Sequence, residues 1–417
     1  MRNASTSFAE TTLQGRRLLF LQGPSSRFFG HLARVCKGLG GEVLRLGVAP
    51  ADRIFWPRKI GRYIPYRAPE ECFPLAFNHI LDTEQPTDIV MLGDGRFHHK
   101  VAIAELRRRN AKITPWIVEH GYLRPNLLLV ETWGTGGRSQ IPAAFLQRTR
   151  DSRNDAQDPP NWAGSFLRYG ALDVAANLTN LSTSWLTYRG YRHYAKDGVL
   201  AEYSGWVGKA LRQKTRSQQT ARALEEIQGD EGPIFLFPLQ LDTDFQLRDH
   251  GLGEPQSETL NRVITSFAQN APTKATLVIK VHPLDNGLAR WDRQVQTLSN
   301  KAGIADRVRF IDGGSVEALM PKLKGVVTIN STVGLTALRQ SVPVLALGRA
   351  IYSEVGLTHK GDLDAFWKNT SDPDQDLIQV FSAFIREHYH VPGVFDGPGA
   401  LVGAKNVAER IARGIPP

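Results

Sequence analysis

The second half of the chain alternates short apolar runs with helix-like segments, and this alternation limits the fold more than any other feature. Residues 233–238, 276–281 and 326–329 are apolar runs that predict buried strands. Between them, residues 257–270 and 289–301 carry apolar side chains at helical spacing and predict amphipathic helices. Strands joined by helical crossovers form parallel sheets. The pattern therefore predicts a Rossmann-like α/β domain.

The first half of the chain opens with the same alternation. Residues 17–23 and 42–48 predict strands, and residues 28–39 between them predict a helix. A strand, a helix and a second strand in this order predict another parallel sheet. The following region, from residue 52 to about residue 73, carries no clear period, so we expect it to be irregular.

A strongly polar segment at residues 212–219 separates the two series and indicates a domain junction. The 417 residues are enough for two domains, each with its own core. We therefore expect an α/β fold with two Rossmann-like domains, residues 1–205 and 206–417, whose parallel sheets face a ligand cleft in a GT-B-like arrangement. Helices predicted at 376–389 and 405–413 are expected to pack back on the first domain.

Charge and cysteine content narrow the classes of partner and the compartment. The formal net charge of +10 favours an anionic partner. The basic residues are dispersed and no zinc-finger, RNP or helix-turn-helix signature is present, so nucleic acid is not expected. No apolar run reaches the ~18 residues that cross a bilayer. Two cysteines, Cys36 and Cys72, cannot form a disulfide framework, which favours the cytoplasm.

A carboxylate and an imidazole follow an apolar strand-like run at residues 113–118. Glu119 and His120 come directly after it, Gly121 permits a sharp turn, and Pro125 restricts the chain again. Open α/β sheets place their chemistry at the carboxyl ends of strands. Glu119 and His120 are therefore candidate catalytic residues, although a strand-to-loop corner whose side chains face water remains an alternative.

The second half offers candidate ligand groups at three strand ends. Lys280 and His282 project to the same side of a strand and could hold a phosphate or a carboxylate. Asn330 to Gly334 opens a helix, whose N-terminal N–H groups favour an anion; an ordinary N-cap at Ser331 is the alternative. After residues 233–238, three further polar side chains are expected to line the same rim: Gln240, Asp242 and Asp244.

Seven short motifs follow one another in a recognisable order. They are Leu21-Gln22-Gly23-Pro24 with Phe28-Phe29, Asp52-Arg53-Ile54-Phe55-Trp56-Pro57, Gly93-Asp94-Gly95-Arg96, Glu119-His120-Gly121-Tyr122-Leu123-Arg124-Pro125, Lys280-Val281-His282-Pro283, Ser331-Thr332-Val333-Gly334 and Tyr352-Ser353-Glu354-Val355-Gly356-Leu357-Thr358. With this set the chain resembles the bacterial capsule polysaccharide biosynthesis and export family, the S and C proteins of capsule loci. The resemblance covers most of the chain and is nearest to the S type.

The resemblance implies a GT-B, retaining glycosyltransferase that uses CMP-Kdo as its donor and requires no cofactor or metal. It implies that Kdo is added to a phosphatidylglycerol-type lipid, which starts the poly-Kdo linker of an exported capsule. The protein would then be peripheral on the cytoplasmic face of the bacterial inner membrane, with a capsule biosynthesis and export complex as its partner. The expected site residues toward the CMP-sugar are Gln240, Lys280, His282, Pro283, Asn330, Ser331, Thr332 and Gly334.

One departure concerns the catalytic carboxylate. C-type members carry Glu-Asp before the glycine, where this chain has Glu119 and His120. We assign the carboxylate role to Glu119, which would stabilise or capture the oxocarbenium-like sugar as in retaining glycosidases. His120 is assigned a proton-shuttle role near neutral pH. Three alternatives remain: a CMP-sialic acid transferase, a nucleotide-sugar 2-epimerase, and a non-catalytic capsule assembly or export partner.

Overall fold

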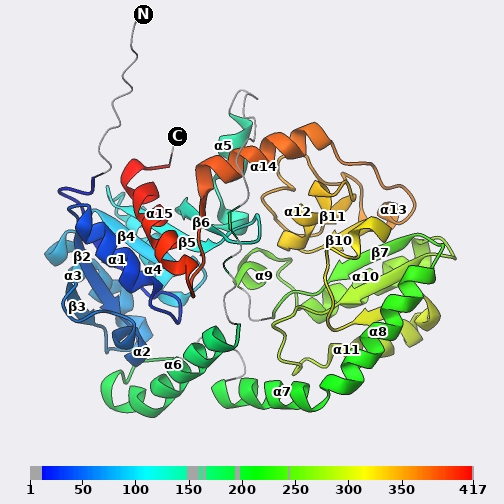
Figure 1. Cartoon of the computed structure of the whole chain (residues 1–417), viewed down its shortest axis with the longest axis horizontal. Coiled ribbons are helices and arrows are strands. Elements are labelled where there is room, and N and C mark those ends of the chain that lie inside the picture. Colours follow the sequence, from blue (N-terminus) through cyan, green and yellow to red (C-terminus); the bar gives the residue numbers. More distant parts are fainter. Residues whose placement is uncertain are drawn as a thin grey trace, which may run out of the picture. The chain divides into compact units, whose positions relative to one another are not determined.

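The chain forms two compact units, each built around one sheet (Figure 1). The computed structural model describes residues 12–147, 159–160, 162, 166–192, 198–242 and 245–415. Contacts group Met1–Thr135, Ala156–Arg192 and Ile385–Pro417 into unit 1, and Gly136–Asp155 with His193–Phe384 into unit 2. The two units are defined by which residues lie in contact with one another. The domain boundary expected at residue 205 stays a prediction.

Unit 1 holds a seven-stranded sheet with the order β12-β6-β5-β4-β1-β2-β3. Its strands are β1 (Arg17–Phe20), β2 (Glu42–Gly47), β3 (Arg62–Pro65), β4 (Asp88–Leu92), β5 (Thr114–His120), β6 (Leu127–Thr132) and β12 (His390–Pro392). Strands β1 to β5 are parallel, whereas β6 is antiparallel to both of its neighbours. The expected parallel arrangement therefore holds for β1 to β5, and β6 departs from it. The loop between β5 and β6, residues 121–126, is too short for the crossover that a parallel strand requires.

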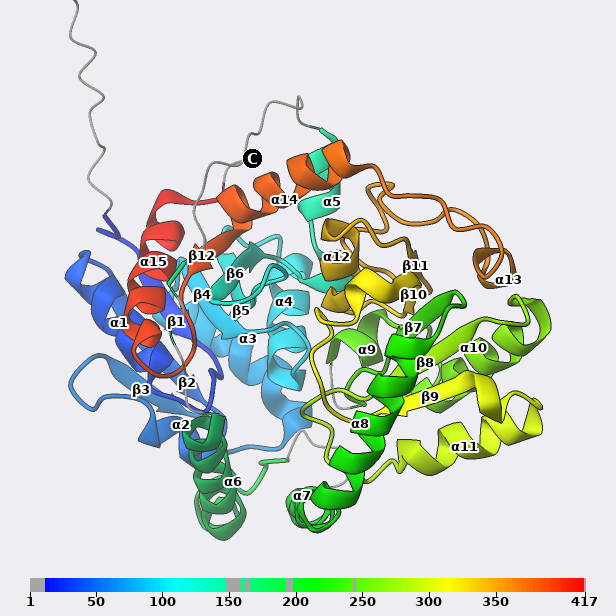
Figure 2. The ribbon, with the colours of Figure 1, turned by 45° about the vertical axis from the view of Figure 1, so that its right-hand side comes forward.

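Alternating side chains of β1 supply the cores on the two faces of this sheet. Leu18 and Phe20 point into one core, and Leu19 and Leu21 point into the other. The helices of unit 1 are α1 (Phe28–Gly38), α2 (Pro50–Ile54), α3 (Phe73–Glu84), α4 (Phe97–Arg108), α6 (Phe166–Thr187) and α15 (Gly399–Arg413). Helices α1 and α15 lie side by side on one face, while α3 and α4 cover the other (Figure 2). Strands buried on both faces explain the continuous apolar runs in the sequence.

Unit 2 holds a five-stranded, fully parallel sheet with the order β11-β10-β7-β8-β9. Its strands are β7 (Ile234–Pro238), β8 (Thr276–Lys280), β9 (Val308–Ile311), β10 (Leu323–Thr328) and β11 (Val344–Ala346). Its helices are α5 (Ile141–Leu146), α7 (Val199–Leu211), α8 (Gln213–Gly229), α9 (Phe245–His250), α10 (Gln256–Asn270), α11 (Trp291–Lys301), α12 (Thr332–Arg339) and α13 (Leu363–Phe366), followed by α14 (Gln375–Tyr389), which leads back to unit 1. The central strand β7 lies between β8 and β10, so the three strand ends that carry the predicted ligand groups are neighbours.

The α/β class with two Rossmann-like sheets is confirmed. The polar segment at residues 212–219 begins at the N-cap of α8 and continues into that helix. The region expected to be irregular contains the end of α2 and all of β3. Strand β3 lies at the edge of its sheet, and its four side chains are only half-buried or exposed. An edge strand of this kind leaves almost no apolar signal in the sequence.

Candidate functional site

Glu119 lies near the carboxyl end of β5, beside the turn that follows β4. Gly93, the first residue of that turn, has φ of +62°, and a Cβ atom there would lie 3.2 Å from Oε1 of Glu119. A side chain at position 93 would therefore be strained and would crowd the carboxylate. The half-buried Glu119 still belongs to the strand, which extends to His120 rather than ending at Val118 as expected.

Side chains from two other segments fix the turn beside Glu119. Nδ1 of the buried His99 lies 2.8 Å from the carbonyl oxygen of Gly93. The carboxylate of Asp94 accepts hydrogen bonds from the hydroxyl (3.1 Å) and the backbone N–H (3.3 Å) of Thr135. Nη1 of Arg96 donates to the carbonyl oxygen of Gly23 (3.1 Å), which joins this turn to the one after β1. The motifs around Gly23, Gly93 and Glu119 thus form one rim at the carboxyl edge of the sheet.

His120 lies at the end of β5, and its ring contacts Phe395 edge-to-face at a centroid distance of 4.8 Å. The residue keeps solvent-exposed surface, yet the surrounding protein and, second, the Arg124 guanidinium lower its pKa. A lowered pKa leaves the imidazole neutral at pH 7. A neutral imidazole can accept a proton, and the proton-shuttle role assigned to His120 stays a prediction.

The loop after Glu119 is held by a histidine distant in sequence. Nε2 of the buried His390 accepts hydrogen bonds from the backbone N–H groups of Tyr122 (2.9 Å) and Leu123 (3.4 Å). Its Nδ1 donates to the carbonyl oxygen of Ile385 (2.7 Å), so the ring is neutral with its proton on Nδ1. Burial, opposed only in part by this bond, lowers the pKa of His390 to about 4. His390 is a positioning residue that the sequence analysis did not find, since nothing near it in sequence marks the role.

Acidification is expected to destabilise the protein through His390. The unfolded ring would bind a proton near its ordinary pKa of 6.5, whereas the native ring binds one only near pH 4. The contribution of His390 to the free energy of unfolding is therefore fully present above about pH 6.5. From the size of this pKa shift, the free energy of unfolding falls by roughly 3 kcal/mol as the pH drops toward 4. Urea unfolding at pH 7 and pH 5 measures the loss. The variant His390→Gln should show a smaller loss than the wild type; an identical loss would exclude His390 as a source.

The Asp52 motif forms a buried ion pair and backbone hydrogen bonds within unit 1. Asp52 Oδ1 pairs with Nη2 of Arg45 (2.7 Å), and both residues are buried. Asp52 Oδ2 accepts from the backbone N–H groups of Val48 (2.9 Å) and Ala49 (3.1 Å). The Arg45 guanidinium also lies over the ring of Trp56, 5.8 Å from its centroid. Asp52 therefore neutralises the buried Arg45 guanidinium, and the role of the motif is structural.

In unit 2, Gln240 and Asn330 join the ends of β7 and β10. Nε2 of Gln240 donates to Oδ1 of Asn330 (2.8 Å), and the Asn330 backbone N–H donates to Oε1 of Gln240 (3.2 Å). Gln256, absent from the predicted site, bonds the backbone of Gln240 in both directions and donates to Oδ1 of Asp242 (3.3 Å). These contacts bring Gln240, Asp242 and Asn330 to one rim; Asp244 lies outside the described residues.

Ser331 is the N-cap of α12, as its alternative interpretation expected. Its hydroxyl accepts a hydrogen bond from the backbone N–H of Val333 (3.2 Å). The hydroxyl of the buried Tyr352 donates to the carbonyl oxygen of Ser331 (2.6 Å). A Cβ atom at Gly334 would collide with that hydroxyl, so the glycine allows Tyr352 to reach the turn. The cap leaves the helix N-terminus, where Thr332 is half-buried, as a place for an anion.

Lys280 and His282 differ in their surroundings. Lys280, the last residue of β8, is 2% exposed, and no other side chain in the described part of the chain bonds to its ammonium group. Desolvation lowers the pKa of Lys280, opposed by Asp312. Nδ1 of His282 accepts from the backbone N–H of Leu284 (3.1 Å), which places the proton of a neutral ring on Nε2. Nε2–H is then the atom able to donate to a phosphate, while Pro283 is exposed.

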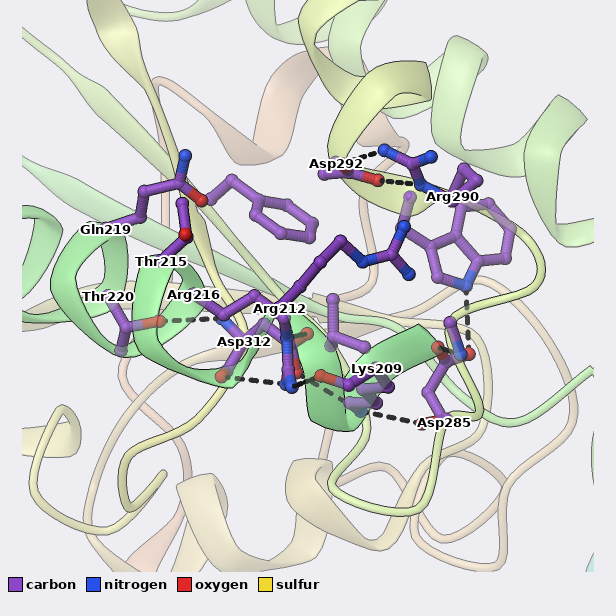
Figure 3. Close-up of a pocket in the computed structure, with 14 residues that line it drawn as sticks. Lys209, Arg212, Thr215, Arg216, Gln219, Thr220, Asp285, Arg290, Asp292 and Asp312 are labelled. Carbon is purple, nitrogen blue, oxygen red and sulfur yellow. Dashed lines mark hydrogen bonds and ion pairs between the residues drawn. The ribbon is translucent and has the colours of Figure 1, made fainter. Parts of the chain in front are cut away.

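A pocket of about 350 Å³ lies beside the loop that follows β8 (Figure 3). Four cations and three carboxylates line it, which gives the lining a formal charge of +1: Lys209, Arg212, Arg216 and Arg290 against Asp285, Asp292 and Asp312. Lys209 and Arg216 pair with Asp312, and Arg290 pairs with Asp292. Arg212 extends toward Arg290 and Asp292 without an ion pair to any described residue. The pocket can hold a small anion.

Within the described ranges, no group of three or more His, Cys, Asp or Glu side chains is arranged to hold a metal ion. None of the helices that the structure describes is long and apolar enough to span a membrane.

Comparison with known proteins gives consistent matches. A sequence model of the family described as "Capsule polysaccharide biosynthesis protein" matches residues 87–395. The chain is 28% identical over 391 residues to Capsule polysaccharide export protein KpsS of Escherichia coli, covering 92% of this chain and 97% of that protein. It is 27% identical over 375 residues to Capsule polysaccharide modification protein LipB of Neisseria meningitidis serogroup A, with 88% of each covered.

Among solved structures, Thermosulfurimonas dismutans KpsC, a beta Kdo 2,7 transferase, is similar with a TM-score of 0.44 and 12% identity. The similarity covers 88% of this chain and 89% of that one.

Proposed function

Because this chain belongs to the capsule polysaccharide biosynthesis protein family, we propose that it is a retaining, GT-B-type glycosyltransferase that transfers Kdo from CMP-Kdo to a phosphatidylglycerol-type lipid. Transfer to the lipid would start the poly-Kdo linker of an exported capsule. The observation that carries the proposal is the span of the family match, residues 87–395, which includes Glu119 in unit 1 and the predicted donor residues in unit 2.

The donor side of the proposal uses the carboxyl edge of the unit 2 sheet. Breaking the bond between Kdo and the CMP phosphate leaves negative charge on the departing phosphate. Nε2–H of His282, the ammonium of Lys280 and the N-terminus of α12 at Ser331 would stabilise that charge. Gln240 and Asn330, locked together by two hydrogen bonds, would give this edge a fixed shape toward the nucleotide.

The acceptor side of the proposal uses Glu119. As the bond to phosphate breaks, positive charge develops on the sugar ring, and a nearby carboxylate stabilises it or captures the anomeric carbon. The acceptor hydroxyl then attacks that carbon, which breaks any bond formed to Glu119, and its proton passes to the neutral imidazole of His120. The position of Glu119 near the end of β5, beside the glycine turn, supports the first role. We propose that this scheme needs neither a metal nor a cofactor.

The location follows from the acceptor. A lipid acceptor requires peripheral binding at the cytoplasmic face of the inner membrane, where the net charge of +10 favours anionic lipids. We propose a capsule biosynthesis and export complex as the partner at that membrane. The similarity to KpsS, which is described as an export protein, supports this choice.

The test is transfer from CMP-Kdo, generated in the reaction, to a short-chain phosphatidylglycerol, followed by mass spectrometry. We expect the acceptor to gain the mass of one Kdo, and excess CMP-sialic acid should compete poorly. Transfer of sialic acid would identify the alternative donor. Stabilisation of the protein by CMP without any transfer would retain the donor site and refute the proposed acceptor. Neither signal would favour a non-catalytic assembly partner.

A further inference from the structure

Exposed apolar side chains gather on two helices that the proposed chemistry does not use. Of the seventeen large apolar side chains that are exposed among the described residues, nine lie on α6 and α7. They are Val174, Leu178, Leu181, Trp185 and Leu186 on α6, and Leu200, Trp206, Val207 and Leu211 on α7. A soluble surface does not usually concentrate its apolar side chains in this way, and such a patch marks an interaction site.

Helix α6 presents its apolar side outward and its polar side inward. On the inward side, Asp173 accepts a hydrogen bond from the Ser25 hydroxyl (2.8 Å), and Oδ1 of Asn180 accepts from the Ala51 backbone N–H (2.9 Å). On the outward side, Val174, Leu178, Leu181 and Trp185 recur at the spacing i, i+4, i+7, i+11, which forms one stripe. Trp185 is 69% exposed. This orientation is the reverse of an ordinary surface helix.

Helix α7 in unit 2 has the same reversed orientation. Its inward face packs on the loop after β8: Nζ of Lys209 donates to the Asp285 carbonyl oxygen (2.6 Å), and Gly205 lies against Leu288. Its outward face carries Leu200, Val207 and Leu211, again at i, i+7 and i+11, with exposed fractions of 70%, 60% and 83%. The helix therefore exposes a stripe that no described segment of the protein covers.

We propose that the outward faces of α6 and α7 bind the interfacial layer of an anionic lipid bilayer. Every exposed residue described on these two helices is uncharged, so insertion would bury no charge. The α6 face includes the exposed Trp185, and tryptophan favours the membrane interface. On α7, Trp206 lies beside the outward stripe, with the ammonium of Lys209 over its ring. Exposed cations follow each helix, Arg189 after α6 and Lys214 after α7, where lipid phosphates would lie.

A bilayer fits these faces better than a protein partner does. The two helices belong to different units, so one rigid partner would have to match both faces in a single arrangement. A fluid interface accepts each helix separately. The inference deepens the proposed function and rests on it, because a lipid acceptor must be reached at a membrane; the apolar faces themselves are observed independently of any activity.

The test is sedimentation of the full-length protein with vesicles. One set contains phosphatidylcholine alone, and the other contains phosphatidylcholine mixed with phosphatidylglycerol. The double variants Leu178→Glu/Leu181→Glu and Val207→Glu/Leu211→Glu should each lower binding to the anionic vesicles at least about tenfold, since apolar insertion is lost and negative charge is added. The matched control Leu401→Glu/Val402→Glu alters exposed apolar residues on α15 and should bind as the wild type does.

The remaining outcomes separate this inference from the proposed function. Unchanged vesicle binding by both α6 and α7 variants, with native circular dichroism, would overturn the inference. Loss of a solution dimer in the same variants, measured by light scattering, would instead assign the faces to a second copy and also overturn it. Transfer to a soluble short-chain acceptor should persist in the variants. If the wild type bound vesicles and the variants did not, but the wild type transferred no sugar, only the proposed function would be refuted.

Discussion

Replacing Glu119 with Gln is expected to lower the rate of sugar transfer about a hundred- to ten-thousandfold while leaving CMP binding intact. Glutamine has nearly the same shape, so the turn at Gly93 should accommodate it. It lacks the negative charge that would stabilise or capture the developing cation on the sugar. Initial rates by mass spectrometry measure the first effect, and the thermal shift that CMP produces measures the second.

The variant His282→Ala provides the matched comparison. It removes the proposed phosphate donor in unit 2 and should diminish the CMP-induced thermal shift, which Glu119→Gln should preserve. Loss of transfer with an intact CMP-induced shift would identify a catalytic carboxylate, whereas a diminished CMP-induced shift would identify a donor-binding imidazole. Full activity in Glu119→Gln would eliminate the catalytic assignment, and an unchanged CMP response in His282→Ala would eliminate the donor assignment.

Replacing Asp52 with Ala is expected to destabilise the protein by about 3–5 kcal/mol, the usual cost of removing one partner of a buried ion pair. Arg45, 3% exposed, would keep its charge without its carboxylate, and the backbone N–H groups of Val48 and Ala49 would lose their acceptor. The change in the free energy of unfolding, measured with urea, tests this expectation.

The double variant Asp52→Ala/Arg45→Met distinguishes an unpaired charge from a simple loss of packing. It removes the stranded cation and keeps an apolar chain against Trp56, so it should recover much of the lost stability. If Asp52→Ala lowered the free energy of unfolding by less than about 1 kcal/mol, the Asp52–Arg45 pair would contribute no more than an exposed ion pair does. That result would contradict the structural role of Asp52. No recovery in the double variant would contradict the role of the unpaired charge.

Local sequence patterns were sufficient for the elements that lie at the centre of each sheet. Strands such as β1, β7 and β8 are buried on both faces and therefore appear as continuous apolar runs. The edge strand β3 gives little apolar signal, and the reversed direction of β6 depends on the short turn between β5 and β6. The burial of a central strand is visible in its amino-acid composition. The pairing of an edge strand and the direction of a strand are not.

The candidate site shows the same limit. The rim formed by Gln240 and Asn330 follows from strand order, because the ends of adjacent parallel strands meet. The supporting residue His390 acts across a long separation, because it bonds to Tyr122, 268 residues earlier. A single sequence holds no record of such a contact, so the role of His390 emerged only from the structure. Tyr352 lies in one of the sequence motifs, but its hydrogen bond to Ser331 is likewise seen only in the structure.

The return of the chain to unit 1 has a consequence for how the protein is made. Strand β12, His390 and α15 follow unit 2 in the sequence, yet they complete the sheet, the Glu119 loop and one core of the first unit. During translation, the ribosome must therefore release residues 390–413 before these contacts can form. The second unit is synthesised before these residues and can fold while the first is unfinished. Maturation of the proposed catalytic loop is thus timed by a segment made after the whole of the second unit.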